Sequence, residues 1–306
     1  MDLNNKLKGL PHIYYFNLDN RVDRKEYIEN QFEKWNISNY TRISGTKYLA
    51  SEWKKWIHLV DGFQSEEHLI DHMKHNKHAP FLSIGTTINH IDFLSFWLKS
   101  TNDENLILME DDYDLSLIEY WHFDWEYLMN NIPYDWDCIQ LGYESNIEIK
   151  FFLCTKPISG TFFGPCMLNR RYVEHLVNLY YDQQNNIFTI FKNNEFFNVD
   201  NSICENGKVY CLPLITINNK LGSGEDNIPL EEYYQGNKIS RELYYYWWEN
   251  QRDKITLEQF FKLDGGGMIL SVEKILKKMF SRCWWVAGNK FSLPWWDLPN
   301  MNNNTI

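Results

Sequence analysis

Three consecutive acids, Glu110, Asp111 and Asp112, directly follow the apolar run 106–109. A short aliphatic run is typical of a buried strand in a parallel or mixed sheet, and ligands of open α/β sheets bind beyond the carboxyl ends of such strands. Three neighbouring carboxylates repel one another and resist desolvation, and a divalent cation relieves both costs. Mg²⁺ and Mn²⁺ bind carboxylate oxygens together with substrate phosphates. The block therefore indicates a metal–nucleotide site, with a solvated loop that caps the next element as the alternative.

The elements that must position this block predict an α/β fold. Residues 12–18 are typical of a strand, 21–35 of a helix with Asp19 or Asn20 as its cap, and 40–43 of a second strand, which together open a βαβ unit. A helix over 83–98, capped by Ser83, is expected before the strand that ends at Glu110. The remaining predicted elements are strands over 137–141, 161–168 and 208–212 and an amphipathic helix over 170–181. This alternation indicates a Rossmann-like mixed sheet flanked by helices.

Composition and charge narrow the class of protein. The chain has 306 residues, of which 44% are hydrophobic and 17% aromatic, so it is long and apolar enough for a substantial core. A formal net charge of −11 argues against nucleic acid as the main partner. The six cysteines include no C-x-x-C pair, which favours buried thiols in a reducing compartment. Because the first twelve residues lack an apolar signal core and no apolar run is long enough for a bilayer, we expect a cytoplasmic protein.

Two further segments carry residues that invite a functional interpretation. Four histidines, at positions 68, 72, 75 and 78, recur at helical spacing and would suit a transition metal, but the lysines among them favour a solvated helix face. Residues 269–286 combine an apolar stripe with lysines and end in Trp284 and Trp285. This pattern predicts a basic amphipathic helix, and the stretch 269–296 would suit either a peripheral membrane contact or packing on the domain or a homo-oligomeric partner.

Ordered sequence blocks resemble glycosyltransferase family 25, which includes lipooligosaccharide and collagen galactosyltransferases. The N-terminal strand ends in N-L-D and is followed by R-x-D-R, and the acidic block matches the E-D-D of the family. Thr86 and Asn89 differ from the family pattern. The other similar blocks are R-I-S-G at 42–45, I-G with His90, D-x-x-x-L-G at 137–142, G-T at 160–161 with Arg170, V-D at 199–200 and the neighbourhood of 223–227.

The resemblance implies a GT-A fold over residues 1–227 and a metal-dependent reaction that inverts the anomeric centre. The donor would be a UDP-hexose, with galactose favoured and glucose next. The acceptor would be a hydroxyl of a glycan, a lipooligosaccharide or a protein. Residues 228–306 have no counterpart in the family and are expected to form a helical extension for acceptor, membrane or oligomer contacts.

The donor side of the implied site draws on the acidic block and on the end of the first strand. Asp112 is the expected ligand of Mn²⁺ or Mg²⁺, with Asp114 as a further candidate, because Asp112 and Asp114 form a D-x-D pair. Glu110 and Asp111 would orient donor hydroxyls or support Asp112. The residues expected near the nucleotide are Asn17, Asp19, Arg21, Arg24 and His90. The arginines would pair either with phosphate or with neighbouring acids, and the histidine would contact phosphate or be held in the core.

Inverting transfer needs a general base for the acceptor hydroxyl. Asp200 is the expected base, with Asp226 or Glu225 as alternatives, and the competing interpretation of Asp200 is a helix cap near Asn201. A non-catalytic glycan- or partner-binding protein on the same scaffold is the main alternative function. A two-metal phosphohydrolase would need a second carboxylate or histidine cluster, and the sequence offers none with convincing spacing.

Overall fold

The computed structural model describes residues 6–45, 57–60, 80–145, 147–156, 161–162, 164–185, 187–191, 199–218, 231–265 and 267–272. The histidine-rich segment 68–78 and the candidate bases Glu225 and Asp226 lie outside these ranges, and so does most of the predicted amphipathic stretch 269–296. Among the described helices, none combines the length and apolar character that crossing a bilayer requires.

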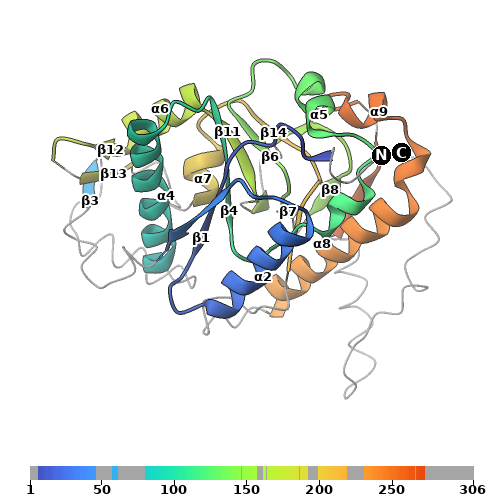
Figure 1. Cartoon of the computed structure of the whole chain (residues 1–306), viewed down its shortest axis with the longest axis horizontal. Coiled ribbons are helices and arrows are strands. Elements are labelled where there is room, and N and C mark those ends of the chain that lie inside the picture. The colour runs from blue at the N-terminus through green and yellow to red at the C-terminus, as the bar shows by residue number, and fades with distance from the viewer. Residues whose placement is uncertain are drawn as a thin grey trace.

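A seven-stranded mixed sheet forms the centre of the molecule (Figure 1). Its strands, in spatial order, are β2 (Tyr40–Ser44), β1 (Ile13–Asn17), β4 (Asn105–Glu110), β11 (Cys166–Asn169), β6 (Cys138–Gln140), β14 (Val209–Cys211) and β9 (Cys154–Thr155). β2, β1 and β4 are parallel to one another. β11 is antiparallel to both β4 and β6, so β4 and β6 point in the same direction and their carboxyl ends share one edge. β14 is parallel to β6, and β9 is antiparallel to β14.

Helices cover both faces of this sheet, which confirms the predicted α/β fold (Figure 1). On one face lie α2 (Val22–Lys34), α5 (Trp125–Asn131), α8 (Glu231–Asn250) and α9 (Leu257–Phe261), together with the 3₁₀ helices η2 (Ser116–Tyr120) and η4 (Arg252–Lys254). On the other face lie α4 (Pro80–Ser100), α6 (Arg170–Tyr180) and α7 (Val199–Cys204).

The buried strands supply both layers because successive side chains point to opposite faces. Tyr15 and Met109 face the layer that contains α2 and α8, whereas Tyr14 and Leu108 face the layer that contains α4 and α6. Continuous apolar runs such as 106–109 are therefore required by a sheet that is covered on both sides.

Four small sheets surround the central one. They pair β7 (Glu144–Ser145) with β10 (Thr161–Phe162), β5 (Tyr113–Asp114) with β15 (Thr216–Ile217), β8 (Glu148–Lys150) with β16 (Ile269–Ser271), and β13 (Ile187–Phe191) with both β12 (Tyr181–Asp182) and β3 (Ile57–Val60). β7 follows the carboxyl end of β6, and β5 follows the carboxyl end of β4.

Several predicted boundaries are wrong in instructive ways. The cap residue of α2 is Arg21, which makes no side-chain capping bond, because Asp19 instead accepts hydrogen bonds from Arg42 and Ser44. The helix expected to start at Ser83 starts at Pro80, a residue suited to the first helical position because it has no amide hydrogen to satisfy. The single strand predicted over 161–168 is two strands, β10 and β11, that pair with different partners.

The segment after residue 230 contributes to the same core as the N-terminal strands. Trp247 of α8 and Phe260 of α9 are fully buried and pack in one cluster with side chains of β1 and β4. Residues 269–271, predicted as the start of an amphipathic helix, instead form β16, where Leu270 is buried opposite Ile149 of β8. The edge of β8 offers backbone hydrogen bonds, and this tertiary pairing overrides the helical pattern.

Candidate functional site

The acidic block lies where the order of the parallel strands reverses. β1 has β2, the next strand in the chain, on one side and β4 on the other, and Phe16 of β1 is in register with Glu110 of β4. Such a reversal leaves a crevice beyond the carboxyl ends of the two diverging strands, which is where open α/β sheets bind ligands. Asn17 and Glu110, the last residues of β1 and β4, mark this position.

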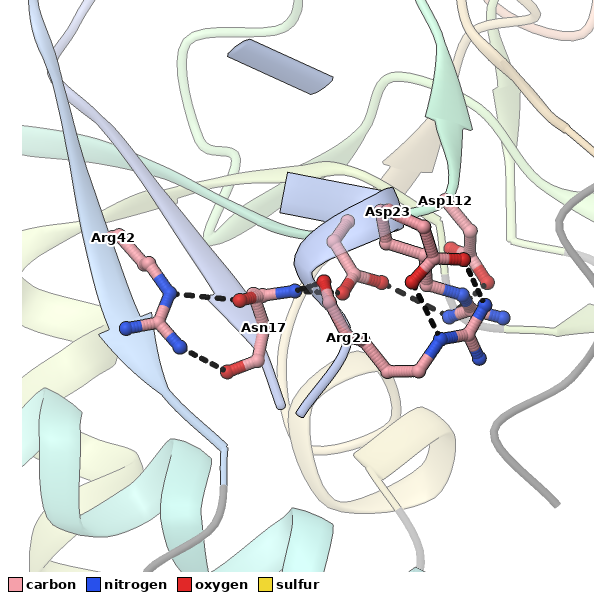
Figure 2. A network of polar contacts seen from close by, with 7 residues as sticks. Asn17, Arg21, Asp23, Arg42 and Asp112 are labelled. Atoms are coloured by element: carbon pink, nitrogen blue, oxygen red, sulfur yellow. Dashed lines mark hydrogen bonds and ion pairs between the residues drawn. The ribbon is translucent and has the colours of Figure 1, made fainter. Parts of the chain in front are cut away.

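Asn17 joins the three parallel strands at this edge (Figure 2). Its Nδ2 donates to Asp111 Oδ2 at 2.7 Å and to the carbonyl of Arg21 at 2.9 Å. Its Oδ1 accepts from Nε of Arg42 on β2 at 2.7 Å. With only 3% of its surface exposed, Asn17 is a positioning residue that holds the acidic block against β1 rather than a group that faces ligand.

Arg24 is the cation that partly neutralises the acids. Its Nη1 lies 2.9 Å from Asp111 Oδ1 and 3.2 Å from Asp112 Oδ2, and its side chain is 9% exposed. α2 is fixed here because Gln31 donates to the carbonyl of Tyr113 at 2.9 Å and accepts from the amide of Leu115 at 2.6 Å. The structure therefore favours the ion-pair role for Arg24 over direct pairing with phosphate.

Among the residues that the structure describes, carboxylates outnumber cations at this edge of the sheet. Asp112 Oδ1 is buried and has no hydrogen-bond partner within that part of the chain. Burial raises the pKa of Asp112 to about 6, opposed by Arg24, and burial with the charges of Asp112 and Asp111 raises the pKa of Glu110 to about 8. Asp200 adds to the same field, because its charge also raises the pKa of Glu110. The site is thus arranged to favour an added positive charge.

Asp200 reaches this edge through the direction of its helix. α7 begins at Val199 and leads into β14, whose direction matches that of β4, so its first turn lies at the carboxyl edge of the sheet. Asp200 stands in that first turn, and its negative charge raises the pKa of the buried Tyr113 hydroxyl, after the effects of burial, Glu110, Asp112 and Glu144. Because α7 begins at Val199, Asp200 lies within the first helical turn and is not the cap of a helix that begins near Asn201, and its role as general base stays a prediction.

The sequence-based assignment missed Glu144. This residue follows the D-C-I-Q-L-G segment, is 6% exposed, and its Oε1 has no hydrogen-bond partner among the described residues. Burial and then the charge of Asp112 raise the pKa of Glu144 well above its usual range. The available signal was a lone acid four residues beyond the buried strand β6, whose carboxyl end shares an edge with that of β4.

Other predicted site residues are engaged elsewhere. Arg21 pairs with Asp23 through two hydrogen bonds of 2.9 and 2.8 Å, and Asp19 pairs with Arg42 at 2.5 Å. His90 is fully buried and stacks on Phe16 with ring centroids 3.9 Å apart, and burial lowers its pKa to about 4.

Asp114 links β5 to α8 rather than facing the acidic block. Its Oδ2 accepts from Arg241 at 2.9 Å and from Tyr245 at 2.8 Å, and its Oδ1 accepts from the amide of Ser116. These interactions favour a structural role for this residue. The assignment of a metal to Asp112 and Asp114 together stays a prediction.

The carboxylates of the site fit a hard divalent cation only together with oxygen atoms from a bound ligand or water. Among the described residues no group of three or more His, Cys, Asp or Glu side chains converges as a ready-made metal cage. Mg²⁺ and Mn²⁺ are commonly held by one or two carboxylates plus substrate phosphates and water, and the unpartnered Asp112 Oδ1 is such a carboxylate oxygen.

The surplus of buried acids predicts an unusual dependence of stability on pH. The folded-state pKa of Glu110, about 8, exceeds its ordinary 4.5. The contribution of the protonated Glu110 carboxyl to the stability of the folded state is therefore complete below pH 4.5. This contribution is lost as the pH rises through 8. Because each pKa unit corresponds to about 1.4 kcal/mol, the unfolding free energy in EDTA should fall by a few kcal/mol over this window. Urea unfolding of the wild type and of Glu110→Gln at several pH values checks this. Equal losses in both proteins would contradict it.

Comparison with known proteins adds little to this geometry. No family model matches the chain, and no curated protein matches it. The solved structures that resemble it include the crystal structure of A197 from STIV, with 10% sequence identity and a TM-score of 0.33 over 68% of this chain and 84% of that chain. A likeness at this level carries no argument about function.

Proposed function

We propose that this protein is a metal-dependent inverting glycosyltransferase. It transfers a hexose, galactose in the first place and glucose in the second, from a UDP-sugar to a hydroxyl of a glycan, a lipooligosaccharide or a protein. The observation that carries the proposal is the excess of buried carboxylates at the strand reversal between β1 and β4, where the unpartnered Asp112 Oδ1 lies. A cation–diphosphate pair would supply the missing positive charge and use the crevice that the strand order creates.

Different residues would take separate roles in binding the donor. Asp112 would hold Mn²⁺ or Mg²⁺, and when bound the ion supplies Lewis-acid stabilisation to the departing diphosphate. Arg24 holds Asp112 through one oxygen and leaves the other without a partner. Asn17 fixes Asp111, so the backbone of the acidic block keeps its position when the donor binds. Glu110, which is partly exposed at the end of β4, would contact a donor hydroxyl.

Acceptor activation is assigned to Asp200. An inverting displacement needs a base that takes the proton of the acceptor hydroxyl as the new glycosidic bond forms and the bond to the diphosphate breaks. Asp200 is partly buried, stands in the first turn of α7, and lies in the same electrostatic field as Glu110.

A screen of UDP-, GDP- and CMP-sugars for Mn²⁺-dependent binding and hydrolysis tests this function. We expect a UDP-hexose to bind and to be hydrolysed slowly to UDP, and we expect Asp112→Asn to weaken metal-dependent binding by about tenfold or more. Asp23→Asn is the matched control, since the Asp23 side chain is 57% exposed and, within the part of the chain that the structure describes, forms its ion pair with Arg21. No binding and no hydrolysis with any sugar nucleotide would refute the proposal.

One observation favours the alternative of a non-catalytic binding protein. Arg24 already neutralises Asp111 and part of Asp112, which is what a scaffold without a metal would need. That protein would bind a glycan or partner while neither binding nor hydrolysing sugar nucleotides, so the same screen, extended to a glycan array, separates the two functions.

A further inference from the structure

We propose that a cavity at the edge of the sheet opposite the acidic block binds a neutral oligosaccharide through one of its sugar rings. The cavity has a volume of about 380 Å³ and is lined by residues 104–105, 134–136 and 169–171. Small-molecule sites in proteins have volumes of about 300–1,000 Å³, so this cavity is large enough for a sugar ring. The inference stands apart from the proposed function, because none of these residues belongs to the acidic block.

The cavity lies at the beginning of β4, whereas the acidic block follows the end of that strand. Asn105 is the first residue of β4 and is in register with Asn169, the last residue of β11. Since a strand rises about 3.3 Å per residue, Asn105 and Glu110 are about 17 Å apart along β4. A sugar ring in the cavity therefore does not cover the acidic block.

Hydrogen bonds hold the walls of the cavity in place. The guanidinium of Arg170 donates to the carbonyl of Asp103 at 3.0 Å, and its backbone amide donates to the carbonyl of Glu104 at 2.8 Å. The side-chain amide of Asn169 donates to the carbonyl of Trp136, which joins the remaining wall to the start of α6. Because these segments are already fixed, a ligand need not order them, and less binding free energy is lost.

Tyr134 supplies an aromatic ring to the cavity. It stands in the turn between α5 and β6 and is 98% exposed. A single exposed aromatic side chain is ordinary on a protein surface. Tyr134, however, lines a cavity together with polar side chains, and its apolar face can pack against the C–H face of a sugar ring.

The polar side chains of the cavity offer both acceptors and donors. Within the described part of the chain, the side chains of Glu104 and Asn105 form no hydrogen bond or ion pair. The Arg171 side chain is 73% exposed and pairs with Asp137 through Nη2 at 2.6 Å, and a guanidinium carries further N–H groups. A carboxylate, an amide and a guanidinium suit sugar hydroxyls, because each hydroxyl both donates and accepts.

The charges that line the cavity favour a neutral ligand over an anion. Two carboxylates, those of Glu104 and Asp135, accompany the two guanidiniums of Arg170 and Arg171. The guanidiniums already bind backbone carbonyls and Asp137. A phosphate at the start of α6 would share the cavity with both carboxylates, and like charges repel. A neutral sugar avoids this repulsion.

Saturation-transfer difference NMR with lactose and with maltose tests the inference on the full chain. The variants are Tyr134→Ala, Tyr134→Phe, Glu104→Ala and the control Phe96→Ala. Phe96 lies on α4, is 63% exposed and does not line the cavity. We expect the sugar dissociation constant to rise about three- to tenfold in Tyr134→Ala and in Glu104→Ala. It should stay near the wild-type value in Tyr134→Phe and Phe96→Ala.

Four outcomes would overturn the inference. The first is no saturation transfer from either sugar at about 10 mM, a concentration that detects even millimolar affinity. The second is wild-type affinity in Tyr134→Ala. The third is displacement of the sugar by an equal concentration of inorganic phosphate, which would reveal an anion site. The fourth is sugar binding that Asp112→Asn weakens and Tyr134→Ala does not, which would place the sugar at the acidic block.

The outcome is separable from folding and from the proposed function. Because the Tyr134 side chain is almost fully exposed, Tyr134→Ala should unfold at the wild-type temperature. The same variant should bind UDP-sugars with Mn²⁺ as the wild type does. Sugar binding that depends on Tyr134, alongside no response to any sugar nucleotide, supports the cavity and refutes the transferase.

Discussion

Replacement of Arg24 by alanine is expected to destabilise the protein by about 3–5 kcal/mol, as removal of one partner of a buried ion pair generally does. The change leaves Asp111, whose side chain is 5% exposed, and Asp112, at 14%, without their shared cation. Three acids in sequence would then face one another in a poorly solvated crevice. Urea unfolding at pH 7.5 in EDTA measures the loss as a lower midpoint.

Arg21→Ala is the control for this experiment. Arg21 lies three residues before Arg24 and also pairs with an aspartate, but that partner, Asp23, is 57% exposed. Exposed pairs contribute about 1 kcal/mol or less, so the control should remain near wild-type stability. Equal destabilisation by Arg21→Ala and Arg24→Ala would show that the burial of the Arg24 cluster has no energetic consequence.

Added Mn²⁺ should rescue Arg24→Ala more than it stabilises the wild type. Without the guanidinium, Asp112 presents both oxygens to a cation, and a ligand that binds the folded state more tightly stabilises it more at the same concentration. A midpoint that Mn²⁺ raises equally in the two proteins would mean that the cation binds away from the acidic block.

Gly164→Ala is expected to prevent stable folding. A Cβ at position 164 would lie 1.6 Å from the carbonyl oxygen of Gly142, and a Cβ at position 142 would lie 2.0 Å from the carbonyl oxygen of Ile215. These backbone segments also hydrogen-bond to one another, since the amide of Leu141 donates to Pro165 at 2.7 Å and the amide of Ile215 donates to Leu141 at 2.8 Å. Neither segment can move without breaking the link to its neighbour, so we expect a loss above about 4 kcal/mol.

Soluble yield and circular dichroism at 25 °C measure this effect, with Gly45→Ala as the control. At Gly45 the nearest atom to an added Cβ is Cδ2 of Leu18, 3.2 Å away at the end of a flexible side chain. That variant should fold with a cost of about 1 kcal/mol or less. A Gly164→Ala protein as stable as Gly45→Ala would show that the close packing between position 164 and the backbone of Gly142 can relax.

Local sequence patterns were sufficient where a segment is buried on both sides or amphipathic over several turns. The run 106–109 predicts β4, and the helix expected over 170–181 is α6, with Val173, Leu176 and Val177 on its buried side. In these segments side-chain burial and backbone preference agree. The position of the acidic block at a strand end, and hence at the edge where open α/β sheets generally bind ligands, follows from the same reasoning.

Features that depend on residues distant in the chain could not be predicted from local sequence patterns. β16 is a strand because β8 offers it an edge, although its residues suit the start of a helix. No sequence motif marks Glu144. The charge of Asp112 acts on Glu144 because β4 and β6 run in the same direction on either side of β11. Arg42 and Asn17 meet only after β2 and β1 pair in register.

The amino-acid sequence by itself determined the α/β alternation and the presence of three acids beyond a central strand. Both features depend on residues that are close together in the chain. The tertiary structure decided which charges meet there. It brought Arg24 from α2 to Asp111 and Asp112, and it left Asp112 Oδ1 and Glu144 Oε1 without partners. The net charge around a buried carboxylate depends on segments that only folding brings together, so the excess of negative charge at this edge of the sheet cannot be read from any one segment.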